Sequence, residues 1–275
     1  MLDDIHYYTP QRKTTVDWFI NNFGAKPMAE VSSNPLTFIT FLEISHGQST
    51  INVSPPGPFP GIRVGDPKRW EKEAITPAKD LPPMYGVHWI GMSVPNLKDA
   101  LKSLNANGVE NATLPQSFAL SKQKSSKSAL IWGPDYNRIL LVEHKKTVGN
   151  RIDHLLLLVS DLEANIKFFQ QVLSAEILEQ SQDFARIQVA KHEFILAKPA
   201  YLGLKDEDVI KRHPKKFTPN IDHLGFLYAT QDELKSAFQK ASDAGYQILM
   251  SPKRDRKSTR LNSSHRNTSR MPSSA

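Results

Sequence analysis

Apolar positions along the chain form a pattern that occurs four times: a strand-like apolar run with a histidine near its start, a short polar turn, and an amphipathic helix. The copies begin "DIHYYTPQRKTTVDWFI", "GVHWIGMSVPNLKDALKSL", "IDHLLLLVSDLEANIKFF" and "IDHLGFLYATQDELKSAF". Such self-similarity indicates an internal structural repeat. We call the copies units 1 to 4 in chain order, and their strand histidines are His6, His88, His154 and His223.

Each predicted helix carries its own boundary signals. In unit 4, Thr230 and Glu233 have the spacing of a capping box. Asn96 is the expected cap of the unit 2 helix, and Ser160 or Asp161 is the expected cap in unit 3. The apolar and aromatic side chains that recur at helical spacing in all four units predict buried core, not a cofactor-binding surface.

Strand-like segments follow the helices, such as "LTFITFLEISHGQSTINVSP" in unit 1 and "ARIQVAKHEFILAKP" in unit 3. A unit of this kind exposes an apolar sheet face and needs a partner unit. Residues 54–84 hold eight of the 19 prolines and predict a long loop, and residues 145–151 form a short junction. We therefore expect a first domain at 1–147, with its units at 1–56 and 85–146, and a second domain at 151–253.

Composition narrows the class of protein without naming a reaction. The chain of 275 residues is 39% hydrophobic and has no cysteine, which excludes disulfides, thiolate metal sites and cysteine nucleophiles. No apolar run approaches the ~20 residues that span a bilayer, and the start "MLDDIHYYTP" lacks the features of a secretory signal. We therefore expect a cytoplasmic protein without a membrane partner.

The positive charge is concentrated at the end of the chain. The formal net charge is +7, and residues 255–275 contribute +4 through five arginines and lysines against one aspartate. The stretches "DRKSTRLNSSH" and "SRMPSSA" resemble a translated sequencing-library adapter. We therefore expect residues 254–275 to be a non-native tail, the native protein to be truncated within unit 4, and nucleic acid not to be a partner.

With its four histidine-bearing units, the chain resembles the vicinal oxygen chelate superfamily, which includes glyoxalase I, fosfomycin- and bleomycin-resistance proteins and extradiol dioxygenases. The stretches "IDHLLLLVSDLEANIKFFQQVL", "IDHLGF" and "WGPDYNRILLVEH" carry the resemblance, which extends from residue 1 to about residue 253. It implies an α+β fold in which tandem βαβββ units pair into two domains, the second incomplete. This scaffold hosts many activities, so the fold alone does not choose a reaction.

The resemblance also implies a metal site. Enzymes of the superfamily bind the metal through a histidine from the first strand of each paired unit and a glutamate from the last strand of the second unit. This ligand set leaves positions open for a small-molecule substrate that binds through two oxygens. Fe(II) is the favoured metal, Zn, Ni and Mn are alternatives, and no further cofactor is expected.

In the first domain, His6 and His88 match the two histidines of this ligand set. The glutamate should stand three residues after Asn137, where the chain has Leu140. Glu143 falls on the opposite face of the same strand. A standard metal site is therefore not expected in the first domain, and His6 and His88 are secondary candidates.

In the second domain, His154 and His223 match the pattern and are the primary metal-ligand candidates. The carboxylate should follow in the last strand of unit 4, so the expected truncation removes it. Asp153 and Asp222 precede these histidines and are expected at strand ends or behind the metal ligands. Three further histidines are expected to be solvated, at turns or in the charged insert: His46, His192 and His213.

Two functions compete on these observations. The first is a metal-dependent oxygenase of the extradiol-dioxygenase type, with a glyoxalase-type isomerase or lyase as the alternative enzyme. The second is a non-catalytic protein of the same fold that binds a small molecule, which Leu140 favours for the first domain. No residue is assigned a catalytic role, the truncated chain is expected to be inactive, and a homodimer stays open.

Overall fold

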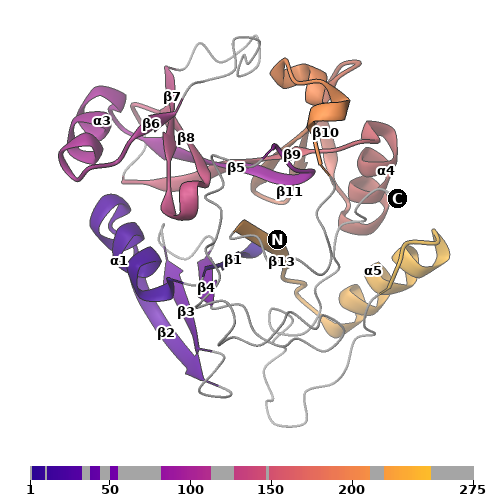
Figure 1. Cartoon of the computed structure of the whole chain (residues 1–275). Coiled ribbons are helices and arrows are strands. Elements are labelled where there is room, and N and C mark those ends of the chain that lie inside the picture. Colours follow the sequence, from indigo (N-terminus) through magenta and orange to yellow (C-terminus); the bar gives the residue numbers. More distant parts are fainter. Residues whose placement is uncertain are drawn as a thin grey trace.

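The computed structural model describes residues 2–9, 11–32, 38–43, 50–54, 82–112, 127–146, 149–210 and 220–248. Within these ranges the chain forms two β-sheets with helices against them (Figure 1). This arrangement confirms the predicted α+β class. Most of the proline-rich insert, the expected tail at 254–275, His46 and His213 lie outside the described residues.

The strands and helices follow the order predicted for each unit. Unit 1 contains β1 (Leu2–Tyr8), α1 (Arg12–Phe23), β2 (Lys26–Ser32), β3 (Phe38–Glu43) and β4 (Thr50–Ser54). Unit 2 contains β5 (Gly86–Val94), α3 (Leu97–Ala106), β6 (Asn111–Ala112), β7 (Ser128–Trp132) and β8 (Arg138–Glu143). Unit 3 contains β9 (Arg151–Leu158), α4 (Leu162–Leu173), β10 (Glu176–Gln180), β11 (Phe184–Val189) and β12 (His192–Ala197). The described part of unit 4 is β13 (Asn220–Phe226) and α5 (Gln231–Asp243).

Helix starts agree with the predicted caps. The side chains of Asn96, Asp161 and Thr230 each accept a hydrogen bond from the backbone N–H three residues ahead, at 3.2, 2.9 and 3.1 Å. Glu233 closes the predicted capping box by accepting the N–H of Thr230. None of the described helices is long and apolar enough to cross a membrane.

The pairing of the units differs from the prediction. One sheet, which we call sheet 1, has the order β13-β1-β4-β3-β2, and the other, sheet 2, has the order β10-β11-β12-β9-β5-β8-β7-β6. Unit 1 therefore pairs with unit 4 through β1 and β13, and unit 2 pairs with unit 3 through β5 and β9, both antiparallel. The sheets are consequently not built from residues 1–147 and 151–253, because hydrogen bonding joins the first unit to the last.

Sheet 2 is packed on both faces. Its helix-facing side shares one apolar core with sheet 1. The opposite side carries a second apolar cluster that includes Trp89, Leu140 and Leu156. Leu202 and Val209, from the segment that follows β12, belong to the same cluster. This face of sheet 2 is therefore covered by the protein's own side chains.

The turn between β7 and β8 connects the two sheets. Asp135 and Tyr136 both have positive φ there, 52° and 57°. The Tyr7 hydroxyl of β1 donates to the Pro134 carbonyl and accepts a hydrogen bond from the Asn137 amide. Burial raises the pKa of Tyr7 well above its usual value, so the hydroxyl stays a donor. These contacts hold β1 against unit 2.

Candidate metal centre

Two of the four strand histidines lie side by side in sheet 1. His6 of β1 is directly opposite His223 of β13, and their ring centroids are 4.4 Å apart. Ile5 and Leu224, the neighbours in each strand, point into the helix-facing core, so the two imidazoles project from the other face. His6 is 5% exposed. The fold thus brings together one residue from the first unit and one from the last.

The spacing of these rings suits a shared metal ion. Two imidazoles bound at about 2.1 Å and roughly at right angles around one metal would have ring centroids ~4.5 Å apart. His6 and His223 meet that condition. In the parallel neighbour β4, Asn52 is opposite His6, and no residue of "TINVS" is acidic. Within the described ranges, no group of three histidine, aspartate or glutamate side chains is arranged to hold a metal, so the two imidazoles are the candidate ligands that the described residues offer here.

The equivalent position in sheet 2 contains a glycine. Gly91 of β5 is opposite His154 of β9, as His6 is opposite His223. His6 and Gly91 each precede the residue that caps their helix by five positions, whereas His154 and His223 each precede theirs by seven. Gly91 is therefore the unit 2 counterpart of His6, and the sequence-based match of His88 to that position is wrong.

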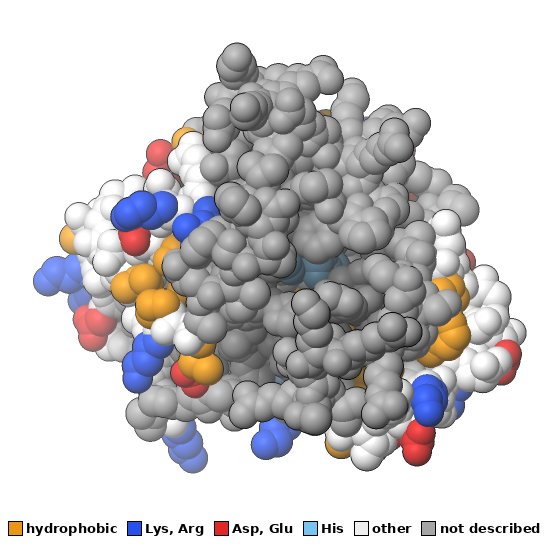
Figure 2. All heavy atoms as spheres, turned by 90° about the horizontal axis from the view of Figure 1, so that it is seen from below, with side chains coloured by type: hydrophobic (Ala, Val, Ile, Leu, Met, Phe, Trp, Pro, Cys, Tyr) orange, Lys and Arg blue, Asp and Glu red, His pale blue; other side chains and the backbone are white. Residues whose placement is uncertain are grey.

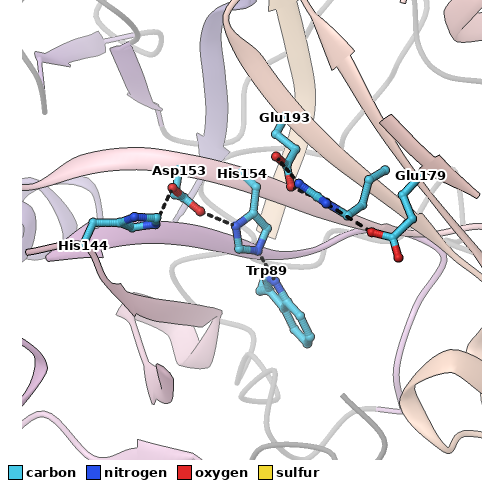
Figure 3. A network of polar contacts seen from close by, with 7 residues as sticks. Trp89, His144, Asp153, His154, Glu179 and Glu193 are labelled. Atoms are coloured by element: carbon cyan, nitrogen blue, oxygen red, sulfur yellow. Dashed lines mark hydrogen bonds and ion pairs between the residues drawn. The ribbon is translucent and has the colours of Figure 1, made fainter. Parts of the chain in front are cut away.

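His154 has no nitrogen available for a metal. Its Nδ1 donates to Asp153 Oδ2 at 3.0 Å, and its Nε2 accepts from the indole N–H of Trp89 at 3.2 Å (Figure 3). The ring is 1% exposed, and a Cβ added to Gly91 would approach it to 2.4 Å. His154 therefore fills the space that a second ligand would need, and it lies in a different sheet from His223.

Asp153 is the acceptor at the centre of this network. It accepts from Ser93 Oγ at 2.9 Å, and its Oδ1 lies 3.1 Å from Nε2 of His144. Burial raises the pKa of Asp153, but the hydrogen bonds and charges of His154, His144 and Ser93 outweigh it and hold the pKa below its usual range. The expected place of Asp153 behind a histidine is observed, although that histidine is not positioned to bind metal. The side chain of Asp222 lies outside the described residues.

Glu193, which the sequence reasoning missed, is the last-strand carboxylate opposite His154 in β12. Its two oxygens accept from Arg186 Nε and Nη2 at 2.8 and 2.9 Å, and Arg186 Nη1 donates to Glu179 at 3.1 Å (Figure 3). Hydrogen bonds with Glu193 raise the pKa of Arg186, so the guanidinium stays charged. Because Glu193 is committed to this cation, sheet 2 does not fit a metal.

The remaining described histidines are also unsuited to binding a metal. Burial, with the nearby positive charge of Arg138, lowers the pKa of His88 to about 3. His192 is 7% exposed, so its predicted solvation is wrong: its position in β12 opposite Val189 buries it. His144 is partly exposed beside Asp153. None of the three lies in sheet 1.

One face of the molecule exposes histidine side-chain atoms. Figure 2 shows histidine side-chain atoms near the centre of one face of the molecule. Lysine, arginine and acidic side chains are mixed over the described parts of that face and do not form one patch of a single sign.

Residues 151–261 match the family model described as Glyoxalase/Bleomycin resistance protein/Dioxygenase superfamily. The sequence of this region, which is less than half of the chain, is similar to that superfamily. The matched region contains units 3 and 4, with His154 and His223. No curated protein sequence is significantly similar to the chain.

Solved structures of a dioxygenase-like protein and of a glyoxalase share the fold along most of the chain. A candidate dioxygenase from Bacillus subtilis has a TM-score of 0.63 and 15% identity, covering 93% of this chain and 78% of its own. Glyoxalase I from Zea mays has a TM-score of 0.59 and 13% identity, covering 89% of this chain and 80% of its own. At such identities the likeness shows a shared fold and does not choose a reaction.

Proposed function

We propose that the chain is a metal-dependent enzyme of the extradiol-dioxygenase type, with its site in sheet 1 at His6 and His223. The observation that carries the proposal is the pair of imidazoles at 4.4 Å on the first strands of units 1 and 4. Two histidines with open positions beside them are the ligand type of non-haem Fe(II) oxygenases, so Fe(II) is the proposed metal. The substrate class is a small molecule that binds through two adjacent oxygens.

In this proposal, His6 and His223 have one task, which is to hold the metal. Neutral imidazole nitrogens are the donors that Fe(II), Zn, Ni and Mn accept. The sheet keeps the rings close together, and the burial of His6 limits competition from water. When bound, the metal would supply a Lewis acid with open positions for two substrate oxygens.

Two alternative functions would use the same pair of histidines. A glyoxalase-type isomerase or lyase would use Zn, Ni or Mn with the same two histidines. A non-catalytic protein that binds small molecules is favoured by one observation, which is the absence of an acidic residue in β4 opposite His6. The two enzyme hypotheses and the binding hypothesis all require His6 and His223, and they differ in the fate of the bound ligand.

The test is metal binding and turnover by the whole chain. We expect about one equivalent of Fe(II) after anaerobic reconstitution, and at least about a 100-fold loss of metal affinity in His6→Gln and His223→Gln, because each removes one of two donors. His154→Gln and His144→Gln are the matched controls and should bind metal as the wild type does. Uptake of dioxygen and a ring-cleavage absorbance with a panel of catechols would identify the dioxygenase.

Several outcomes would overturn the proposal. Binding of less than about a tenth of an equivalent by the wild-type chain with every metal would exclude the metal site. Loss of metal in His154→Gln but not in His6→Gln would place the site in sheet 2 instead. Isomerisation of a hemithioacetal without dioxygen uptake would select the glyoxalase hypothesis, and stoichiometric ligand binding without turnover would select the binding protein.

A further inference from the structure

A buried carboxylate lies beside the two histidines of sheet 1. Asp4 of β1 is 1% exposed and stands two residues before His6, with no register shift between them, so both side chains project from the same face. Its partner in β13 is Gly225, two residues after His223. Asp4 is thus the diagonal neighbour of His223, a spacing of roughly 7–8 Å between Cα atoms that side chains bridge.

The glycine opposite Asp4 makes room for the carboxylate. A Cβ added to Gly225 would lie 2.5 Å from Asp4 Oδ1, which shows that the carboxylate extends across the glycine. In sheet 2 the counterpart of Gly225 is Leu156, which is fully buried in the second apolar cluster. Sheet 1 therefore keeps space for a polar group where sheet 2 is filled by an apolar side chain.

The sheet 2 counterpart of Asp4 contacts its histidine directly. Trp89 stands two residues before Gly91, as Asp4 stands two before His6, and its indole N–H donates to His154 Nε2 at 3.2 Å (Figure 3). An indole can only donate, so it occupies the lone pair that a metal would need. An ionised carboxylate can only accept, so at this position it would engage an imidazole N–H and leave the other nitrogen's lone pair for a metal.

We propose that Asp4 is the positioning residue of the sheet 1 site, where its carboxylate accepts the N–H of the His223 imidazole and orients that ring toward the metal. The inference rests on the proposed function, because it assigns Asp4 to the same site. Asp4 acts through His223 and not as a direct ligand, since no metal-holding group of three is formed by the described residues. It also brings a carboxyl group to a site whose strand β4 has none.

The test compares two variants that alter the Asp4 carboxylate or its surroundings with two control variants elsewhere in the chain. Asp4→Asn replaces the carboxylate by an amide, and Gly225→Ala places a methyl group against the carboxylate. Carboxylates behind a metal-bound histidine change metal affinity by about 10- to 100-fold, so we expect both variants to weaken Zn²⁺ and Fe(II) binding by that factor, measured by chelator competition on the whole chain.

Two control variants separate this role from general damage. Gly91→Ala imposes the same kind of clash in sheet 2, against His154, and Asp17→Asn removes an exposed carboxylate paired with Lys13. Both should bind metal within about twofold of the wild type, because distant sites act independently. Circular dichroism establishes that each variant is folded before its affinity is read.

The outcomes distinguish this inference from the proposed function. Wild-type affinity in folded Asp4→Asn and Gly225→Ala, with loss in His223→Gln, would overturn the role of Asp4 and leave the site intact. Wild-type affinity in His223→Gln as well would overturn both. If Asp4→Asn does not fold, Gly225→Ala decides alone, because weakened binding in the folded alanine variant supports the role and unchanged binding rejects it.

Discussion

The two sheets are built from the same unit pattern, yet their faces opposite the helices have different contents. At the central antiparallel pair, sheet 1 carries His6 against His223, whereas sheet 2 carries Gly91 against His154. In sheet 2 the single imidazole is surrounded by its own hydrogen-bond partners and an apolar cluster. The comparison teaches that one backbone frame can present two adjacent imidazoles or close into core, depending on a few residues at registered positions.

The sheets also differ in how they balance charge. In sheet 2 the carboxylates of Glu193 and Glu179 are bound to Arg186, an internal cation whose side chain is 12% exposed. In sheet 1, β4 brings no carboxylate to the histidines. The guanidinium of Arg186 thus already balances the charge of the two carboxylates that sheet 2 brings together.

The prediction with the largest expected effect places a glutamate at position 140 of sheet 2, where the superfamily pattern has its metal-binding carboxylate. Leu140→Glu should not create a metal site, because Leu140 is fully buried among the apolar side chains of the second cluster. We expect a loss of about 4 kcal/mol in the free energy of unfolding, measured in urea, from burying an unpaired carboxylate.

Leu140→Met is the control and should cost less than about 1.5 kcal/mol, since it conserves apolar volume. A Leu140→Glu protein that keeps its stability and binds a second equivalent of metal would show that the two faces are more alike than their contents indicate.

The second prediction concerns the internal cation of sheet 2. Arg186→Met removes the cation that both Glu193 and Glu179 contact in a mostly buried site, and should lower the free energy of unfolding by about 3 kcal/mol. The double variant Arg186→Met/Glu193→Met should recover most of that loss, because replacing both partners by apolar groups removes the uncompensated charge. Equal stability of the single and double variants in urea titrations would contradict a charge-balancing role.

The third prediction concerns the pH dependence of stability that His88 of sheet 2 causes. The pKa of His88 is about 3 in the native state and about 6.5 when unfolded, so below pH 6.5 only the unfolded state gains its proton. Stability should therefore fall with decreasing pH, by about 1.5–2 kcal/mol between pH 6.5 and 5. His88→Gln should remove that part of the slope, and a parallel slope in wild type and variant would assign the acid sensitivity to other groups.

Local features of the fold could be predicted from the sequence. The caps at Asn96, Asp161 and Thr230 and the strand–helix order of each unit follow from patterns a few residues long. Such patterns depend on backbone groups that each helix leaves unpaired, whatever lies around it. Prediction therefore succeeded where the physical cause is contained within one unit.

The pairing of units could not be predicted in the same way, because all four units offer a similar apolar face and first strand. The lengths of the linkers between units nevertheless indicated which units pair. The junction at 145–151 joins units 2 and 3 and is the shortest, and short connections favour neighbours. The long segments on either side of those two units give unit 1 and unit 4 the length to reach each other.

The candidate site was predicted in part. His6 and His223 were both identified, but each was assigned a different partner, because partners follow from the pairing of units. The match of His88 failed for a further reason: β5 contains register shifts near Trp89 and Met92, so counting from the start of the strand chose the wrong residue. Asp4 and Gly91 were missed because only the registered sheets reveal their positions.

The pairing of β1 with β13 also has a consequence for the order of events during folding. Sheet 2 is formed by contiguous residues 86–197, whereas sheet 1 joins residues 2–54 to residues 220–226. Contacts so distant in the chain form late, because a long loop must close before they contribute. On a ribosome, β1 must therefore wait until residues 220–226 have been synthesised before this strand pair can form.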